Sequence, residues 1–250
     1  MYLKKQQVAS SEIGQSLKTK TISLINLIQD CESLHIDSLT QLNQDLVKQN
    51  AGVFLNYRQI QIYSRPVYRD NLIIKTFPTE TKAFYGYRNT IIYNEQNEVV
   101  VASKSMGAYV QVKTLKNARL SKETLDGIEN YENDHNLLDY PRKVLIPATK
   151  PVKCEPFKIY DYHMDKHQHL NNAYYIEFAE AVLQPQLDYN VIRVEHRVAV
   201  KAKEELEPLL YVVDSAKQVV VLLSNETITS IVEFLKVDNL TGNKQQEEIK

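Results

Sequence analysis

The sequence of 250 residues predicts an α+β fold made of two halves that share one plan. In each half a helical segment comes first, and segments rich in β-branched and aromatic residues follow it. Helices and strands are therefore grouped along the chain, which favours antiparallel sheets over a parallel α/β arrangement. We expect one sheet wrapped around one buried helix in each half.

The first half begins with an amphipathic helix at 21–34, where Leu24, Ile28 and Cys31 fall on one face. A second, short helix follows, with Ser38 as its expected N-cap. Strands complete this half because β-branched and aromatic residues dominate the remaining segments. The expected strands lie at 53–63, 71–77, 83–93 and 98–112.

An acidic, polar stretch at 121–136 separates the halves, and turn signals such as Asp126-Gly127 interrupt it. Beyond it, Pro141 and Pro151 restrict the conformation of the connecting segment. We therefore place a first domain at 1–135, a linker at 136–150 and a second domain at 151–250.

The second half repeats the order of the first, beginning with a helix at 172–183. Tyr175, Ile176, Ala179, Val182 and Leu183 form its apolar stripe, and Pro185 marks its end. The polar tail after Asp238 is not expected to belong to the sheet. The expected strands lie at 191–200, 209–214, 218–223 and 229–237.

Composition excludes several classes of function. A net charge of −1 gives no general attraction to nucleic acid or to an anionic membrane. The six glycines cannot build a phosphate loop, a dinucleotide fingerprint or a serine nucleophile elbow. Cys31 and Cys154 match no metal or redox spacing. We expect no metal, no cofactor and no nucleic-acid partner.

The N-terminal lysines are not followed by an apolar stretch, so the sequence predicts no signal peptide. No apolar run approaches the length that spans a membrane. We therefore expect a cytoplasmic protein without stable membrane insertion, and we leave its oligomeric state open.

The densest group of polar side chains lies directly before the second helix, and it contains Asp165, His167, His169, Asn171 and Asn172. A carboxylate or an imidazole can activate water. The free N–H groups of a first helical turn can hold a developing oxyanion, and we expect those around 169–171 to do so. One of the two asparagines should be the N-cap. This combination suits acyl transfer.

Simpler roles exist for some of these residues. Asp165 alone would cap a turn. His163, His167 and Asp165 would suit a metal site, but no second ligand cluster accompanies them. Glu180 lies beside the apolar stripe of the helix, either as a solvated glutamate or as a carboxylate that contacts substrate.

The pattern Asp-x-x-x-His-Leu-Asn-Asn-x-x-Tyr at 165–175 resembles the hot-dog thioesterases, and the two-half plan narrows the resemblance to the acyl-ACP thioesterase family. Segments of the first half agree with this family at 63–77, 84–93 and 114–119. The resemblance extends to about residue 235.

The resemblance implies a double hot-dog, with two long helices that are each wrapped by a curved antiparallel sheet. It implies that the acyl chain lies in the first half and that catalysis occurs in the second. Asp165 and His169 match the catalytic Asp and His of the family. The expected reaction is hydrolysis of fatty acyl-ACP to free fatty acid and ACP in fatty acid biosynthesis, with no metal.

Two positions depart from the family pattern. His167 stands where the family has asparagine, and Ala199 stands where it has a glutamate. Because alanine cannot transfer a proton, three explanations stay open. Glu195 or Glu180 replaces the missing glutamate, the aspartate and two histidines suffice, or turnover is slow.

Acyl carrier protein is acidic, so docking requires a local basic patch. Arg193, Arg197, Lys201 and Lys203 alternate along one strand region and are expected to form it, although they would also suit a solvated strand face. Two rival functions remain: an acyl-CoA thioesterase of the same fold, and a non-catalytic acyl-binding or regulatory protein.

Overall fold

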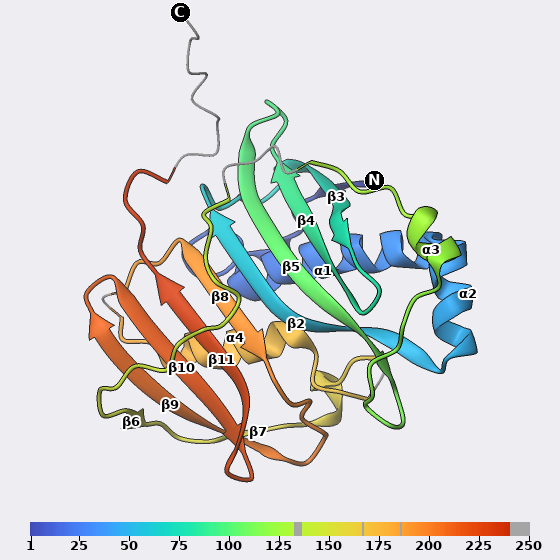
Figure 1. Ribbon diagram of the computed structural model, residues 1–250. Helices are drawn as coiled ribbons and strands as arrows, with labels where there is room; N and C mark the ends of the chain where they lie inside the picture. Colours follow the sequence, from blue (N-terminus) through green and yellow to red (C-terminus); the bar gives the residue numbers. More distant parts are fainter. Residues whose placement is uncertain (133–136, 167, 186, 241–250) are drawn as a thin grey trace, which may run out of the picture. The chain divides into compact units, whose positions relative to one another are not determined.

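The structure is a computed structural model that describes residues 1–250 except 133–136, 167, 186 and 241–250 (Figure 1). The chain forms two compact units. Unit 1 contains residues 1–54 and 60–139, and unit 2 contains residues 55–59 and 140–238. The long strand β2 (Ala51–Ile62) therefore contributes its ends to unit 1 and its middle to unit 2.

Unit 1 has a sheet in which β1, β3, β4 and β5 follow one another as antiparallel neighbours. Ile74, Ile92 and Val101 stand opposite one another across three strands, so their side chains share one face. The elements are β1 (Tyr2–Gln7), the 3-10 helix η1 (Ser10–Glu12), α1 (Thr21–Ser38), α2 (Thr40–Lys48), β3 (Asn71–Thr81), β4 (Tyr85–Tyr93), β5 (Val99–Gln111) and α3 (Lys122–Asp126).

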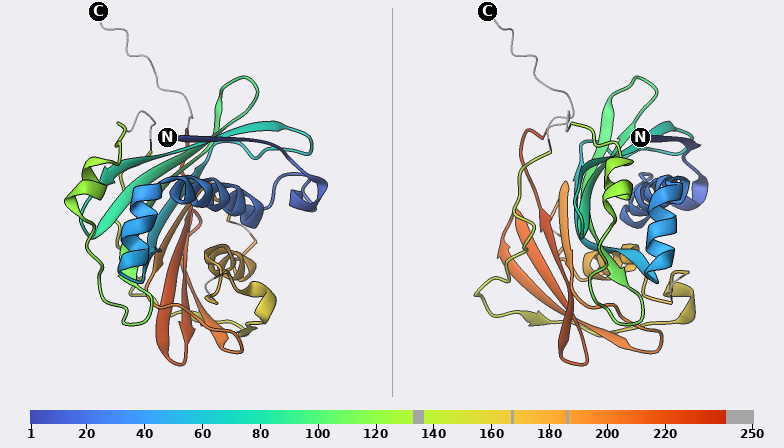
Figure 2. Two further views of the ribbon diagram at one scale, coloured as in Figure 1. Left: turned by 90° about the vertical axis from the view of Figure 1, so that its right-hand side faces the viewer. Right: turned by 45° about the vertical axis from the view of Figure 1, so that its right-hand side comes forward.

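Helix α1 packs against this sheet, with contacts to β1, β3 and β4 (Figure 2). Leu24, Ile28 and Cys31 are buried, as their spacing predicted. Ser38 is not an N-cap, because it belongs to α1 and its hydroxyl donates to the carbonyl of His35 at 2.7 Å. Among the described residues, no helix combines the length and the apolar character that crossing a membrane requires.

Unit 2 repeats the arrangement with a sheet in the order β8, β11, β10, β9, β6, and β7 also pairs with β9. Helix α4 packs against β10 and β11 through Ala173, Tyr175, Ile176 and Ala179, which are all buried. The elements are β6 (Val152–Lys153), β7 (Phe157–Lys158), the 3-10 helix η2 (Asp161–His163), α4 (Asn172–Ala181), β8 (Val191–His196), β9 (Glu205–Asp214), β10 (Lys217–Ser224) and β11 (Thr227–Leu235).

The predicted α+β class is confirmed, but strands that were not predicted precede the main helix of each half, β1 before α1 and the short β6 and β7 before α4. Strand β1 was not predicted, because its side chains alternate between half-buried and exposed at the edge of the sheet and leave little apolar pattern. Strand β8 ends at His196 instead of at residue 200. The N–H groups of Arg197 and Val198 both donate to Thr229 O, and the chain then leaves the sheet.

Candidate active site

The candidate site is the closed loop that connects η2 to α4. A β-bridge between Met164 and Leu170 joins the two ends of the loop. Inside it, Asp165 N–H donates to His169 O at 2.8 Å, and Gln168 N–H donates to Asp165 O at 3.0 Å. Gln168 adopts a φ of 62°, which lets the chain reverse. His167, one of the three predicted catalytic residues, lies outside the described residues.

Asp165 and His169 are brought together by this loop. The carboxylate of Asp165 turns back across the loop, and its Oδ1 accepts the N–H of His169 at 3.1 Å. Both residues are partly buried. Asn171 is the N-cap of α4, because its Oδ1 accepts the N–H of Ala173 at 3.0 Å. The prediction that one of the two asparagines caps the helix is therefore confirmed.

The expected oxyanion donors around 169–171 are engaged within the protein. Leu170 N–H donates to Val200 O, and Asn171 N–H donates to His163 O, both at 3.0 Å. Because His169 N–H is taken by Asp165, the prediction for these three groups is wrong. The N–H of Asn172, the first residue of α4, has no acceptor within the described part of the chain. It is therefore the donor that the helix N-terminus offers.

A second segment, around Val200, is held against the loop from two sides. Val200 O accepts the N–H of Leu170, and Val200 N–H donates to the hydroxyl of Tyr175 at 3.0 Å. Tyr175 is buried, and burial raises the pKa of its phenol to about 12, so it stays protonated. These bonds hold Ala199, which is exposed, beside the loop.

Unit 1 contains the same loop, displaced by 151 positions in the sequence. A bridge between Ile13 and Thr19 joins its ends, and Gly14 N–H donates to Lys18 O at 2.9 Å. Leu17 N–H donates to Gly14 O at 3.0 Å, and Leu17 has a φ of 60°. Helix α1 begins at Thr21, as α4 begins at Asn172. The closed loop is therefore a property of the fold.

The two loops differ in their chemistry. Gly14 and Lys18 stand in unit 1 where Asp165 and His169 stand in unit 2. Because the loop of unit 1 closes without a carboxylate or an imidazole, the backbone does not require either group. Their presence in unit 2 therefore points to a chemical role.

Unit 1 also shows how far a side chain at the position of Ala199 can reach. Pro66 O accepts the N–H of Thr19 at 2.9 Å, as Val200 O accepts the N–H of Leu170, so Arg65 is the counterpart of Ala199. The Arg65 guanidinium donates to Thr19 O at 3.0 Å and to Thr21 Oγ1 at 3.1 Å. A long side chain at this position thus reaches both the loop and the first helical residue.

The two candidate replacements for the missing glutamate lie in different places. Glu195 accepts the N–H of Val144 at 2.9 Å and pairs with Arg197 at 2.9 Å. Its neighbour His196 contacts the ring of Tyr175 in α4, so Glu195 points to the opposite face of the sheet. Glu195 is therefore not the replacement. Glu180 lies near the end of α4, where it accepts a hydrogen bond from the Tyr189 hydroxyl.

The expected basic patch of unit 2 is only partly exposed. The prediction that Arg193 belongs to an exposed basic patch is wrong. Its side chain is 6% exposed and forms an ion pair with Glu233, which also binds Lys217. Strand alternation places it on the sheet face that residues 140–144 cover, and its guanidinium donates to Pro141 O there. Of the remaining members, Arg197 pairs with Glu195, and Lys201 and Lys203 are exposed.

His196 was not predicted as a site residue, although strand alternation alone would have placed it on the face under α4. Its ring meets that of Tyr175 edge to face, with centroids 5.1 Å apart. Both ring nitrogens are buried without a hydrogen-bond partner among the described residues, as is the hydroxyl of Ser230 opposite it. Burial, with a contribution from Arg58, lowers the pKa of His196 to about 3.

We expect the substitution His196→Phe to raise the free energy of unfolding at pH 7 by about 1 kcal/mol, because phenylalanine removes two unsatisfied polar atoms. The folded-state pKa lies below the ordinary value of 6.5, so the unfolded chain binds the proton first. The wild type therefore loses stability as the pH falls from about 6.5 towards 3, and the variant loses less. Urea unfolding of both proteins at pH 7 and pH 5 measures this difference. A less stable variant with the same pH dependence would contradict it.

The profile of the family described as "Acyl-ACP thioesterase N-terminal domain" matches residues 1–128. The crystal structure of an acyl-ACP thioesterase from Bacteroides thetaiotaomicron superposes with a TM-score of 0.83 at 14% identity, over 93% of this chain and 96% of that chain. The 12:0-ACP thioesterase from Umbellularia californica gives a TM-score of 0.80 at 13% identity, over 94% and 96%. At these identities the likeness shows the fold. No curated protein sequence matches the chain.

Proposed function

Because this chain belongs to the acyl-ACP thioesterase family, we propose that Asp165 and His169 carry out its hydrolysis of fatty acyl thioesters at the loop before α4. The predicted double hot-dog fold is confirmed by the structural matches. The predicted thioesterase function is confirmed by the family profile. The observation that supports this assignment is a comparison of the loops before α1 and α4. They close with the same backbone hydrogen bonds, but only the loop before α4 carries Asp165 and His169.

In the proposed mechanism, Asp165 positions a water molecule and accepts its proton as the water oxygen attacks the thioester carbonyl. The hydrogen bond from His169 N–H fixes the orientation of the carboxylate. The negative charge that develops on the carbonyl oxygen is stabilised by the N–H of Asn172 at the positive end of α4. The C–S bond then breaks, and the leaving thiolate takes up the proton that Asp165 accepted, which restores the carboxylate.

The remaining site residues have supporting roles in this proposal. His169 orients the water or the thioester carbonyl through its imidazole, and His167 stands in for the asparagine of the family as a further hydrogen-bond partner. Asn171 acts through the helix start that it caps. Glu180 stays a proposal for substrate contact, supported only by its place on α4.

We place the acyl chain in unit 1, beside the apolar part of α1. Leu24 and Ile28 are buried in the part of the unit where α1 packs against β3. Towards the C-terminal end of α1 the interior becomes polar, since the carboxylate of Glu32 accepts hydrogen bonds from Thr90 at 3.0 Å and Ser105 at 3.1 Å. An alkyl chain that reached this network would disrupt these bonds.

Matched substrates test the proposed function. We expect a higher kcat/KM for acyl-ACP than for acyl-CoA with the same acyl chain, by about tenfold or more, because a folded partner adds binding contacts. Equal or reversed values would favour the acyl-CoA thioesterase. A stoichiometric bound acyl chain without turnover would favour the non-catalytic binding protein. A series of acyl chain lengths measures the depth available in unit 1.

A further inference from the structure

The charges of unit 1 are distributed unevenly along the chain. From Val99 to Lys122 there is no acidic residue, and Lys113, Lys116, Arg119 and Lys122 recur at every third position. Acidic residues resume directly afterwards, with Glu123 in α3. The cations are therefore concentrated on one connection of the fold, which leads from β5 to α3.

The fold anchors this connection to the end of α2. After β5 the chain turns back, with Gln111 N–H donating to Lys116 O and Leu115 N–H donating to Gln111 O, both at 2.9 Å. Val112 N–H donates to Asn50 O at 2.9 Å, which ties the turn to the residues that follow α2. Lys48, at the end of α2, thereby joins the cations of the turn.

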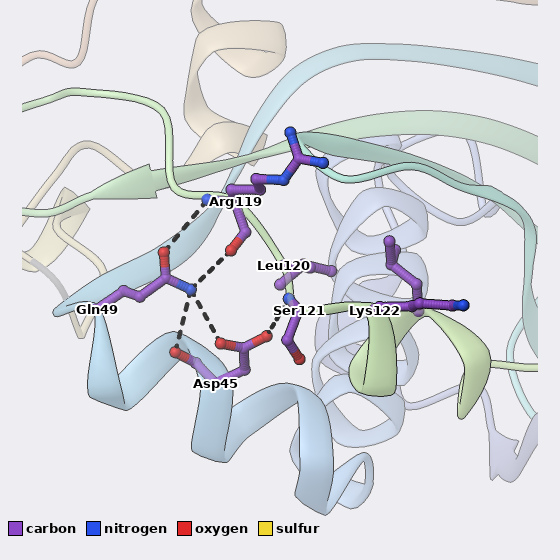
Figure 3. A pocket seen from close by; sticks show the side chains of 7 residues that line it. Asp45, Gln49, Arg119, Leu120, Ser121 and Lys122 are labelled. Carbon is purple, nitrogen blue, oxygen red and sulfur yellow. Dashed lines mark hydrogen bonds between the residues drawn. The ribbon is translucent and has the colours of Figure 1, made fainter.

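The second part of the connection is held by Gln49. Its side-chain amide donates to Arg119 O at 3.0 Å and accepts Arg119 N–H at 3.2 Å, as Figure 3 shows. The side chains of Arg119 and Lys122 extend away from the Asp45 carboxylate in this view. Between α2 and this segment lies an open pocket of about 610 Å³, with Leu120 and Leu125 among its lining residues.

Among the residues that the structure describes, no carboxylate forms an ion pair with the cations of this surface. Lys48, Lys113, Lys116, Arg119 and Lys122 are exposed, and none forms an ion pair with another residue that the structure describes. The carboxylate of Asp45, in the pocket wall, already accepts hydrogen bonds from neighbouring N–H and O–H groups. Although burial opposes the effect, these hydrogen bonds lower the pKa of Asp45 below its usual value.

Large apolar side chains stand among these cations. Val47 is 75% exposed, Leu115 is 70% exposed and Val112 is 48% exposed. Leu115 also has a φ of 56°, a conformation that is uncommon for a residue other than glycine. Apolar side chains presented together on a charged surface are typical of a protein-binding site. The hairpin patch consists of these three residues with Lys48, Lys113, Lys116, Arg119 and Lys122.

We propose that the hairpin patch docks the acidic face of the acyl carrier protein, an inference that rests on the proposed function. Unpaired cations attract an acidic partner and speed its association, and the exposed apolar side chains supply area that becomes buried on contact. The basic surface expected in unit 2 is a weaker candidate, because Arg193 is buried and Arg197 is paired. Lys201 and Lys203 are its exposed members.

The test reverses the charge of two residues at the tip of the patch. We expect Lys113→Glu with Lys116→Glu to raise KM for acyl-ACP by about tenfold, since each lost surface contact is worth up to about 1 kcal/mol and repulsion adds to it. The salt dependence of kcat/KM should weaken at the same time. Hydrolysis of acyl-pantetheine, an uncharged thioester, should be unchanged. The matched control is Lys201→Glu with Lys203→Glu in unit 2.

Fluorescence anisotropy of labelled holo-ACP supplies a readout that does not need turnover. Weaker binding by the hairpin variant with normal binding by the control would support the proposal. Normal binding by the hairpin variant, or a loss confined to the control, would overturn it. If the wild type hydrolyses neither acyl-ACP nor acyl-pantetheine, the proposed function fails, and the anisotropy comparison still decides whether the patch binds ACP.

Discussion

Replacing Asp165 by asparagine is expected to lower kcat/KM for acyl-ACP by at least about 100-fold, because asparagine cannot accept the proton of the attacking water. The loop itself should persist. Asn Oδ1 can still accept the N–H of His169, and the loop of unit 1 closes with Gly14 at this position. Steady-state hydrolysis and urea unfolding of the same preparations measure the two effects separately.

The control for this variant is Asp161→Asn in η2, which removes an exposed carboxylate four positions earlier. It should hydrolyse acyl-ACP at the wild-type rate. Full activity of Asp165→Asn would remove Asp165 from the mechanism. A loss of activity that is matched by a large loss of stability would assign Asp165 a structural role instead.

Replacing Ala199 by glutamate is expected to raise kcat by about tenfold or more, which is less than the roughly 100-fold or more that a positioned acid–base group typically contributes. The resemblance implies glutamate at this position, and its counterpart in unit 1, Arg65, spans the distance to Thr19 O and Thr21 Oγ1. In unit 2 the corresponding atoms belong to Leu170 and Asn172, at the start of α4. Because Ala199 is exposed, the larger side chain meets no packed core.

Val198→Glu is the matched control, since it adds the same charge at an exposed neighbouring position. It should leave kcat unchanged. Combining Ala199→Glu with Asp165→Asn should return activity to the level of Asp165→Asn alone, because the added carboxylate assists the base and does not replace it. An unchanged or lower kcat in a folded Ala199→Glu variant would show that this enzyme does not use the position.

The apolar periodicity predicted the elements that position the site. The stripe of α1 is buried where the 3.6-residue period placed it, and so are Tyr175, Ile176 and Ala179 of α4. Val182 and Leu183 lie beyond the end of α4 and are half-buried. The β-branched segments form the antiparallel strands of both units. The spacing of Asp165 and His169 also predicted their proximity, because the loop between them is short and closes locally. Local patterns are sufficient for such features, since the interacting residues are close in the sequence.

The partners of single polar groups could not be predicted in this way. The N–H groups of Leu170 and Asn171 looked available for an oxyanion, but Val200 O and His163 O accept them. Arg193 looked exposed, but it is buried against Glu233 on a neighbouring strand. In each case the deciding neighbour is brought in by sheet pairing or by a chain reversal, and no local pattern records it.

The two similar loops also separate what local sequence predicts from what the tertiary structure decides. Gly14 and Asp165 share no chemistry, so the sequence halves show a common order of elements without residue identity. Backbone hydrogen bonds make the loops alike, and they are insensitive to most side chains. The sequence by itself thus determined the fold class and the family, and it supplied the residues that we propose for the chemistry. Only the tertiary structure decided which donors stay free and which cations face solvent, because both depend on contacts between distant segments.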